Sequence, residues 1–355
     1  MNILLYDVDS VLPNIALMKL STYHKNKGDT VELIKGEAKR TNINYENYDK
    51  GYASVIFHKN KELIDGFPFE IGGVGYDLHK NLPEDIEHLM PDYSLYPDNE
   101  YSIGYTTRGC IRECSFCVVP QKEGNIEFNA NLEEFYNPNL KKIMLLDNNI
   151  FAYKNYRDIF DQIGKTKKRT TFKQGLDFRI INNDKIDALL SIKYDREYIF
   201  AYDSMTIRQT IERNMNKYRN RFKDWSLKFF VLVGYDTTLA EDIFRIKYLK
   251  EHKCLPYIMR HENCYSSPNA GFYNDLGAYC NQVWIFKTME FQEMVERRHV
   301  TQKRIDYSIG LWRKNVGWIW KLSLYIGRKN ISNIRNNCNF IYMWHYYIMA
   351  YIIKE

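Results

Sequence analysis

The stretch Thr107-Arg-Gly-Cys-Ile-Arg-Glu-Cys-Ser-Phe-Cys117 places three cysteines, Cys110, Cys114 and Cys117, within eight residues. Thiolates are soft ligands that select zinc or iron–sulfur clusters, and a compact loop carrying three of them can hold three corners of a cubane. No fourth cysteine lies nearby, whereas structural zinc usually has four protein ligands, often from two Cys-x-x-Cys pairs. The spacing therefore predicts an iron–sulfur cluster in which one iron lacks a protein ligand.

The order Cys-x3-Cys-x2-Cys, with Phe116 directly before the last cysteine, resembles the signature of the radical S-adenosylmethionine (SAM) superfamily. The resemblance implies that Cys110, Cys114 and Cys117 bind a 4Fe–4S cluster and that Phe116 lies beside the adenine of SAM. It also implies that the open iron binds the amino and carboxylate groups of SAM. One electron, from a donor such as flavodoxin or ferredoxin, would then cleave SAM into methionine and a 5'-deoxyadenosyl radical that takes a hydrogen atom from a substrate.

Two other interpretations of the cysteines are weighed against this one. The three thiols could be simply buried, or they could form a zinc knuckle completed by a distant ligand such as His261 or Cys264, in a non-catalytic zinc or nucleic-acid-binding protein. The remaining cysteines are Cys254, Cys264, Cys280 and Cys338, which contain no compact pair. We therefore expect them to be buried single thiols and not an auxiliary cluster. No three-cysteine set precedes residue 101, which argues against a methylthiotransferase, because such enzymes hold a second cluster in their N-terminal domain.

Composition favours a redox-protected enzyme in the cytoplasm. The chain has 355 residues, is 45% hydrophobic and 26% charged, and carries seven cysteines, whereas a secreted disulfide framework favours an even number in a short chain. The start, Met-Asn-Ile-Leu-Leu-Tyr-Asp, reads as a first strand and not as a signal peptide. The longest apolar run, residues 340–353, is too short to span a bilayer, so no membrane association is expected.

Residues 1–98 predict a short Rossmann-like domain and a linker. Strands are expected at residues 3–6, 30–34 and 53–57, with a helix over residues 13–27 between the first two. A further strand runs into the glycine cluster Phe69-Glu-Ile-Gly-Gly-Val-Gly-Tyr76. This arrangement resembles the cobalamin-binding domain that precedes many radical SAM domains, which implies a corrin near the glycines. The alternative is that the glycines only turn the chain, and the lack of an Asp-x-His-x-x-Gly motif around His24 or His58 favours it.

Residues 99–295 alternate predicted strands with helices, which indicates a parallel sheet with crossover helices. The expected strands cover residues 101–106, 142–147, 170–178, 198–203, 227–234 and 254–259. The number matches the partial (β/α)6, TIM-like barrel that the radical SAM resemblance implies, and the first strand would deliver the cysteine loop from its carboxyl end. Leu232-Val-Gly-Tyr-Asp-Thr-Thr238 and Tyr257-Ile-Met-Arg260 resemble cobalamin-binding-type radical SAM proteins of anaerobic bacteria and phages, within a similarity that spans residues 69–295.

Polar residues follow the carboxyl ends of five successive expected strands. The active site of a barrel lies at this end of its strands. Many superfamily members carry Gly-Gly-Glu after the second strand to contact the methionine amine of SAM, and here the segment reads Asp147-Asn148-Asn149. The resemblance thus makes Asp147 or Asn148 the amine acceptor. The later strand ends add Gln174, Asp203 and Gly234 as candidate SAM contacts, although each polar residue alone is more often a turn former or helix cap.

Residues 296–355 predict a basic, aromatic, helical extension. Residues 301–355 contain nine Lys or Arg and two Asp or Glu, while residues 1–300 sum to −1. Apolar residues from Ile305 to Ile319 recur at helical spacing, so one helix face should pack on the barrel. Lysines, arginines, tryptophans and tyrosines elsewhere in the extension could meet phosphates and bases, which makes nucleic acid a candidate substrate. A capping helix with a solvated basic face is the simpler interpretation.

The sequence therefore predicts a radical SAM enzyme that acts on a substrate it does not identify. Hydrogen abstraction and methyl transfer both remain open. Oligomeric state and the role of the C-terminal extension are equally undetermined by the sequence.

Overall fold

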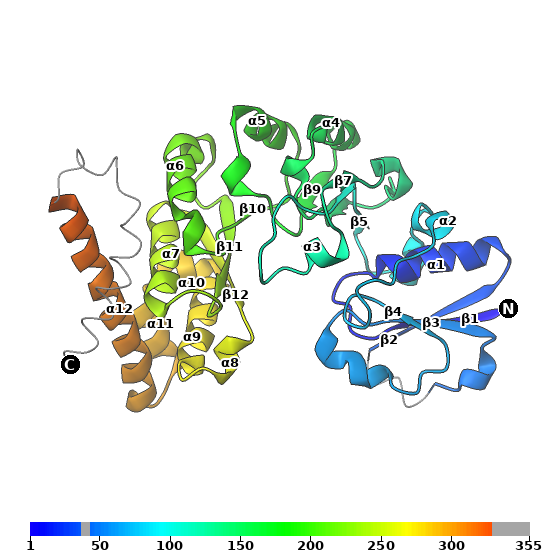
Figure 1. Ribbon diagram of the computed structural model, residues 1–355, viewed down its shortest axis with the longest axis horizontal. Helices are drawn as coiled ribbons and strands as arrows, with labels where there is room; N and C mark the ends of the chain where they lie inside the picture. Colours follow the sequence, from blue (N-terminus) through cyan, green and yellow to red (C-terminus); the bar gives the residue numbers. More distant parts are fainter. Residues whose placement is uncertain (37–42, 329–355) are drawn as a thin grey trace. The chain divides into compact units, whose positions relative to one another are not determined.

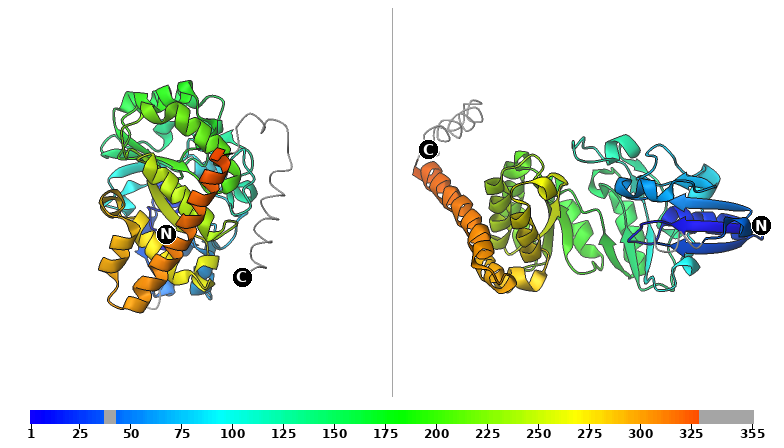
Figure 2. Two further views of the ribbon diagram at one scale, coloured as in Figure 1. Left: turned by 90° about the vertical axis from the view of Figure 1, so that its left-hand side faces the viewer. Right: turned by 90° about the horizontal axis from the view of Figure 1, so that it is seen from below.

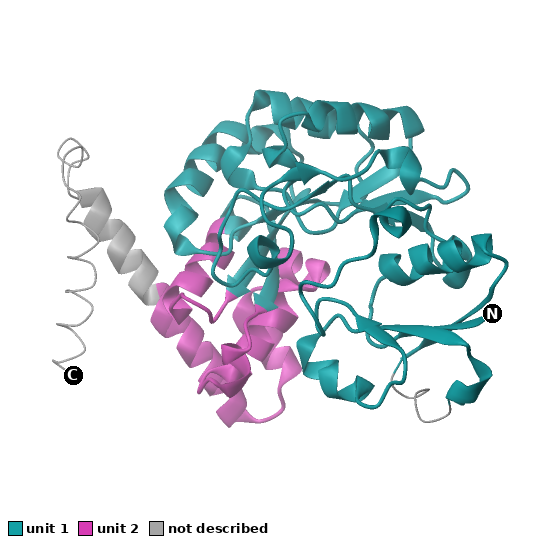
Figure 3. Ribbon diagram, turned by 45° about the vertical axis from the view of Figure 1, so that its right-hand side comes forward, with its two compact units in different colours: residues 1–232, 249–259 teal, residues 233–248, 260–355 magenta. Residues whose placement is uncertain are grey.

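The computed structural model describes residues 1–36 and 43–328 of the chain. It divides into two compact units (Figure 3), one formed by residues 1–232 with 249–259 and the other by residues 233–248 with 260–355. The fold is mixed α/β with parallel sheets and a helical C-terminal part, in agreement with the predicted class (Figure 1). The three segments expected from the sequence, 1–98, 99–295 and 296–355, stay a prediction.

The N-terminal strands are β1 (Asn2–Asp7), β2 (Thr30–Lys35), β3 (Lys50–Ser54) and β4 (Glu70–Gly72). They form one sheet in the order β2-β1-β3-β4, and every neighbouring pair is parallel (blue in Figures 1 and 2). Alternate β1 residues enter different cores: Leu4 and Tyr6 pack with Phe67, whereas Ile3 and Leu5 pack with Leu17. The short Rossmann-like sheet thus has a hydrophobic layer on both faces.

Helix α1 (Ile15–Asn26) begins after Asn14, whose Oδ1 accepts a hydrogen bond from the Leu17 N–H, and helix α2 (Glu84–Glu87) follows Pro83. The strand expected at residues 53–57 is shifted: β3 ends at Ser54. The cause is Asp9, whose carboxylate accepts the N–H groups of Ile56 at 2.7 Å and Phe57 at 2.9 Å. Those two backbone donors are therefore withdrawn from the ladder.

Six further strands occur where the sequence predicts them. They are β5 (Tyr101–Gly104), β8 (Lys142–Leu145), β9 (Arg169–Phe172), β10 (Tyr198–Ala201), β11 (Leu227–Val233) and β12 (Leu255–Arg260). Two three-stranded sheets, β5-β8-β9 and β10-β11-β12, contain them, and the parallel bridges Thr170–Tyr194 and Leu176–Phe200 join the chain around β9 to the chain around β10. The third expected strand is shorter than predicted, because Gly175 at φ 86° turns the chain. Helices α4 (Tyr156–Thr166), α5 (Asn183–Ser191), α6 (Arg208–Tyr218) and α7 (Leu239–Glu251) fill the intervals.

The second unit is helical after β12. It contains α8 (Asn263–Ser266), α9 (Ala270–Cys280), α10 (Val283–Thr288), α11 (Phe291–Arg298) and α12 (Gln302–Arg328). The buried carboxylate of Asp275 on α9 accepts hydrogen bonds from Ser308 and Arg304 of α12 at 2.6 and 2.9 Å, and Trp312 stacks on Phe291 with ring centroids 4.4 Å apart. The helical C-terminal part is thus confirmed, whereas packing of the α12 face on the barrel stays a prediction, because the contacts described here are with α9 and α11.

Some predictions fall outside the described residues. These are the placement of the apolar run 340–353, of Cys338 and of the basic side chains beyond residue 328. Among the helices that the structure does describe, none combines the length and the apolar character needed to cross a bilayer.

Candidate functional site

The three cysteines lie on one loop whose two ends are held together. Strand β6 (Thr107–Arg108) pairs antiparallel with β7 (Glu127–Phe128), a short hairpin that the sequence did not predict, and the Cys110 N–H donates to the Gly124 carbonyl at 3.0 Å. Within the loop the Cys117 N–H donates to the Cys114 carbonyl at 2.9 Å, and helix α3 (Val119–Lys122) follows. All three thiols are half-buried and none is in a disulfide. The loop thus presents three thiols from a closed frame.

Asp147 anchors the start of this loop. Its Oδ1 accepts hydrogen bonds from the Thr106 hydroxyl, the Thr107 N–H and the Thr107 hydroxyl at 2.5, 2.6 and 2.7 Å, and its Oδ2 accepts the Thr106 N–H at 3.2 Å. The side chain is 1% exposed, and burial raises its pKa although the threonine hydrogen bonds oppose that rise. Its oxygens therefore serve the fold of the loop, and the two threonines are functional residues that sequence reasoning missed.

The next two residues also reach the loop. Asn148 Oδ1 accepts the Gly109 N–H at 3.0 Å, and Asn149 Nδ2 donates to Cys110 Sγ at 3.3 Å. Asn149 is 3% exposed, and its Oδ1 is buried without a hydrogen-bond partner among the described residues. A buried acceptor left unpaired costs about 1–3 kcal/mol, and this oxygen next to a cysteine of the loop could accept a hydrogen bond from a bound group.

A guanidinium group lies against the middle cysteine. Arg179 acts electrostatically on Cys114, and its guanidinium is held by Asp177, through Nε to Oδ1 at 2.6 Å and Nη2 to Oδ2 at 3.0 Å. Arg112 of the loop reaches the same carboxylate at 3.1 Å. Burial raises the pKa of Cys114 and of Cys117, the positive charge of Arg179 opposes the rise at Cys114, and the negative charge of Asp203 adds to it at both. Arg179 gave no signal in the sequence.

The other predicted contacts are placed less closely. Phe116 is 38% exposed on the loop, Gln174 is exposed, and Asp203 Oδ1 accepts the Leu232 N–H at 3.2 Å. Gly234 belongs to the second unit, where its φ is 71° and a Cβ would lie 2.3 Å from Cys264 Sγ. Packing alone therefore requires glycine at position 234.

The remaining described cysteines differ from the loop cysteines. Cys254, Cys264 and Cys280 are at most 1% exposed, and burial raises the pKa of Cys254 to about 12 and of Cys264 to about 11. In the described part of the chain no three His, Cys, Asp or Glu side chains are spaced to hold a single metal ion. The Asn149 side chain and the Arg112 backbone each direct an N–H donor at Cys110 Sγ, and the three thiols of the loop stay the predicted ligands of a cluster.

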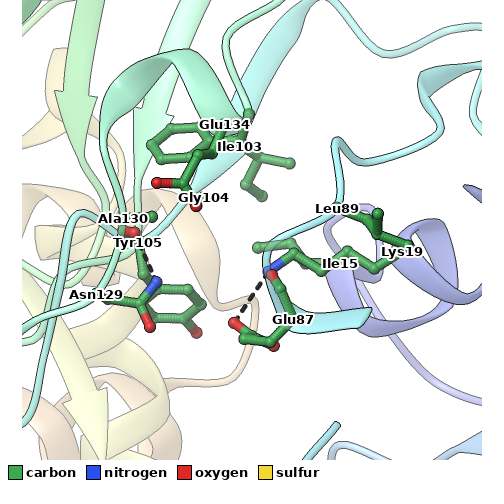
Figure 4. Close-up of a pocket in the computed structure, with 11 residues that line it drawn as sticks. Ile15, Lys19, Glu87, Leu89, Ile103, Gly104, Tyr105, Asn129, Ala130 and Glu134 are labelled. Atoms are coloured by element: carbon green, nitrogen blue, oxygen red, sulfur yellow. Dashed lines mark hydrogen bonds and ion pairs between the residues drawn. The ribbon is translucent and has the colours of Figure 1, made fainter. Parts of the chain in front are cut away.

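A series of ion pairs links the N-terminal residues to the cysteine loop. Lys19 of α1 pairs with Glu87 of α2 at 2.9 Å, as Figure 4 shows. Glu87 also accepts from Arg108, the residue before Gly109, at 2.9 Å. Arg108 donates onward to Glu123 at 3.1 Å. Burial alone would raise the pKa of Glu87, but the two cations outweigh burial and lower it. The adjoining cavity measures about 10 Å³, room for little more than one water, so the contact is structural.

The glycines of the N-terminal domain pack on its own backbone. A Cβ on Gly73 would lie 2.3 Å from the Val55 carbonyl oxygen, and one on Gly75 would lie 2.7 Å from the Phe57 carbonyl carbon. The carboxyl end of β1 is also engaged, because Asp7 accepts the Tyr96 hydroxyl at 2.8 Å. These contacts explain why glycine is needed at positions 73 and 75, and the expectation that the domain binds no cobalamin stays a prediction.

Comparisons with known proteins point to one class of enzyme. The chain is 38% identical over 126 residues to the tRNA-2-methylthio-N(6)-dimethylallyladenosine synthase of Rickettsia akari (strain Hartford), covering 34% of this chain and 24% of that protein. It is 41% identical over 122 residues to the synthase of the same name from Rickettsia bellii (strain OSU 85-389), covering 27% of each. The synthase of that name from Aquifex aeolicus (strain VF5) is 22% identical over 219 residues, covering 54% of this chain and 49% of that protein. A scan against protein-family models finds no match.

These relatives are radical SAM enzymes, so the similarities and the cysteine loop support an enzyme of the radical SAM class, with iron–sulfur and SAM-binding character. The chain spans about half the length of these relatives or less. At this identity and coverage the comparisons support the radical SAM class but no narrower family within it. The alternative of a non-catalytic zinc protein is not favoured.

Proposed function

We propose that this chain holds a 4Fe–4S cluster at Cys110, Cys114 and Cys117 and uses it to cleave SAM reductively. When bound, the cluster would supply the electron that splits SAM into methionine and a 5'-deoxyadenosyl radical. The observation that carries the proposal is the convergence of residues 147–149 on the cysteine loop: Asp147 fixes its start, Asn148 holds Gly109, and Asn149 reaches Cys110. A loop tied down in this way can keep three thiolates in one geometry.

We assign the ammonium group of SAM to Asn149. Its buried, unpaired Oδ1 sits on a side chain whose Nδ2 contacts Cys110 Sγ, so an acceptor is available beside the cluster loop. Asp147, the first candidate from the sequence, has its oxygens engaged by Thr106 and Thr107, and Asn148 has its Oδ1 engaged by Gly109. Phe116 as the adenine neighbour, and Gln174, Asp203 and Gly234 as further SAM contacts, stay proposals.

We further propose that β5, β8, β9, β10, β11 and β12 form one partial (β/α)6 barrel, supported by their sequential order and the bridges near β9 and β10. The substrate class we favour is RNA, supported by relatives whose names specify tRNA. Methylthio transfer itself is not part of the proposal. An electron donor such as flavodoxin or ferredoxin would be the redox partner.

The proposal is tested by anaerobic reconstitution of the full chain with iron and sulfide. The protein should bind about four irons per chain and absorb at roughly 400 nm. After reduction with dithionite it should release 5'-deoxyadenosine from SAM, which liquid chromatography detects. The same preparation should retain no corrin absorption after incubation with hydroxocobalamin and desalting. A colourless zinc protein, or an iron-loaded protein that binds SAM without cleaving it, would refute the function.

Replacing Asn149 by alanine should weaken SAM binding by about tenfold, because a hydrogen bond to a charged group contributes roughly 1.5–3 kcal/mol. Cluster content should stay near that of the wild type, since the three cysteines and the Asp147 anchor remain. Isothermal titration of SAM into the reconstituted protein measures the effect. Asn155→Ala, an exposed asparagine before α4, is the control and should bind SAM normally. If N149A binds SAM with the same affinity as the wild type, Asn149 does not contact SAM.

A further inference from the structure

The loops that enter β8, β9, β10, β11 and β12 are strongly basic in sequence. The segments are residues 141–142, 165–169, 193–197, 223–228 and 250–253, here called the basic rim. They contain twelve basic and four acidic side chains, a net charge of +8, against +6 for the whole chain. The cysteine loop follows the carboxyl end of β5, whereas the rim gathers the amino ends of the strands, so the rim is not part of the site described above.

Contacts within the rim join its loops into one edge. Asp195 pairs with Lys142 at 2.9 Å and with Arg169 at 3.7 Å, and Glu197 pairs with Lys228 at 2.8 Å. Asp224 pairs with Lys253 at 2.6 Å, and the Trp225 N–H donates to the Lys253 carbonyl at 2.7 Å. Most acidic groups of the rim are therefore already neutralised by neighbours on the adjacent loop.

Several cations of the rim remain available. The exposed side chains of Lys165, Lys167, Lys193, Arg196 and Lys223 form none of the ion pairs found in the described part of the chain. None of the large exposed apolar side chains found among the described residues lies in the rim. A surface of spaced, unpaired cations without apolar anchors matches a nucleic-acid interface and lacks the aromatic or aliphatic centre of a protein interface.

The backbone of the rim gives a second, independent sign. Among the described residues, four that are not glycine have positive φ: Lys167 at 56°, Arg196 at 67°, Trp225 at 64° and Lys253 at 52°. All four lie in the rim. The left-handed conformation is costly for residues with a Cβ, and glycine is the usual choice there. A helix dipole favours a cation in the last turn of a helix, as at Lys165 of α4, but it does not require one at the left-handed position.

We propose that the basic rim binds the phosphate backbone of RNA, an inference that rests on RNA as the substrate class proposed above. Lys167, Arg196 and Lys253 carry positive charge at left-handed positions where glycine would suit the backbone better. Strained backbone of this kind is often found at functional sites, so the three charges are evidence for a function of the rim. Five neighbouring strands at about 4.8 Å spacing give an edge of about 19 Å, over which one strand of a duplex presents about five phosphates. A four-residue strand is only about 13 Å long, so a folded RNA can reach from the rim to the opposite edge.

The test compares the wild-type chain with a triple variant, Lys167→Gly, Arg196→Gly and Lys253→Gly. Binding of a fluorescein-labelled RNA stem-loop is followed by fluorescence anisotropy between about 0.05 and 0.2 M salt. The affinity should fall by about tenfold or more, and the slope of log affinity against log salt should become shallower by about 2, since each lost phosphate contact removes about one and Lys253 is already paired with Asp224. The melting temperature should stay the same or rise, because glycine relieves the left-handed backbone.

Two matched variants separate charge from fold. Glutamine at the same three positions should bind RNA as weakly as glycine but melt at a lower temperature. Glutamine at Lys27, Lys59 and Lys61, exposed cations of the N-terminal domain, should leave RNA affinity unchanged. The inference would be overturned if the glycine variant kept the RNA affinity of the wild type, or if the variant at Lys27, Lys59 and Lys61 lost as much affinity. It would also be overturned if the glycine variant lost binding to flavodoxin but not to RNA.

The rim variant also distinguishes this inference from the proposed function. Its RNA-independent cleavage of SAM should equal that of the wild type, because the cysteine loop and residues 147–149 are untouched. If the wild-type chain binds RNA through the rim but never cleaves SAM, the proposed function is refuted and RNA binding by the rim is not. If the chain cleaves SAM but its RNA affinity does not depend on the rim residues, RNA binding by the rim is refuted and the proposed function is not.

Discussion

Replacing Cys114 by alanine is expected to abolish the iron–sulfur cluster and, with it, all cleavage of SAM. A cubane bound by three cysteines already has one iron without a protein ligand, so the loss of Cys114 would leave two irons unsupported. Cys114 is also the thiol whose pKa the positive charge of Arg179 lowers against the effect of burial, and Asp177 holds that guanidinium. Apart from Cys110 and Cys117, which would each hold one corner of the cluster, no cysteine in the described part of the chain lies on that loop.

Iron content and the release of 5'-deoxyadenosine measure the effect. C114A should bind no stable cluster after anaerobic reconstitution, against about four irons per chain in the wild type, and its product should fall to the level of a protein-free control. Cys254→Ala is the matched control, because Cys254 is fully buried and its raised pKa of about 12 keeps the thiol protonated at neutral pH. A C114A protein that keeps the cluster, or a C254A protein that loses it, would contradict the ligand assignment.

The strands were predictable because their apolar residues form short continuous runs between polar turns. Ile3, Leu4 and Leu5 on β1 and Phe229 and Val231 on β11 are all fully buried, as a parallel strand covered on both faces requires. The end of β3 was not predictable from such a run. The residues from Ala53 to Phe57 are uniformly suited to a strand, and only the Asp9 carboxylate, far away in sequence, determines where the ladder stops.

The cysteine loop stood out in the sequence because of its spacing, whereas the residues that hold it in place did not. The polar segment after β8 stood out in the sequence, but the role of Asp147 depends on the register between strands. Gly104 of β5 pairs with Leu145 of β8, so two residues further on Thr106 comes to lie beside Asp147. Periodicity does not fix register between strands that are distant in sequence.

Arg179 and the basic rim show the same limit. Arg179 lies 65 residues after Cys114, and its approach to the thiol follows from the turn at Asp177, which also binds Arg112 of the loop. The lysines and arginines of the rim are scattered singly or in short runs along the sequence, and only parallel pairing of strands brings them to one edge. Charge counted along the chain placed the positive excess in the C-terminal extension, and charge counted in space adds a second basic surface.

Replacing Gly109 by alanine is expected to open the cysteine loop and cause the cluster to be lost rapidly. Gly109 has φ 83°, a conformation that costs a residue with a Cβ about 1–2 kcal/mol. A Cβ there would also lie 2.0 Å from the Asn125 carbonyl oxygen and 2.5 Å from its carbon, so backbone and not a flexible side chain would have to move. That movement would break the neighbouring contact between the Cys110 N–H and the Gly124 carbonyl, which closes the loop.

Gly124→Ala supplies the control within the same loop. Gly124 also has positive φ, 68°, but a Cβ on it would meet no atom within 4 Å. Both variants therefore carry a similar conformational cost, and only G109A adds the collision with Asn125. We expect reconstituted G109A to lose iron to a chelator at least about tenfold faster than G124A, a difference of about 1.4 kcal/mol in the barrier, measured by the decay of the cluster absorption. Because G124A isolates the strain of the left-handed backbone, equal rates in the two variants would mean that the contact between Gly109 and Asn125 does not hold the loop, and that the Asp147 anchor alone keeps the three thiols in place.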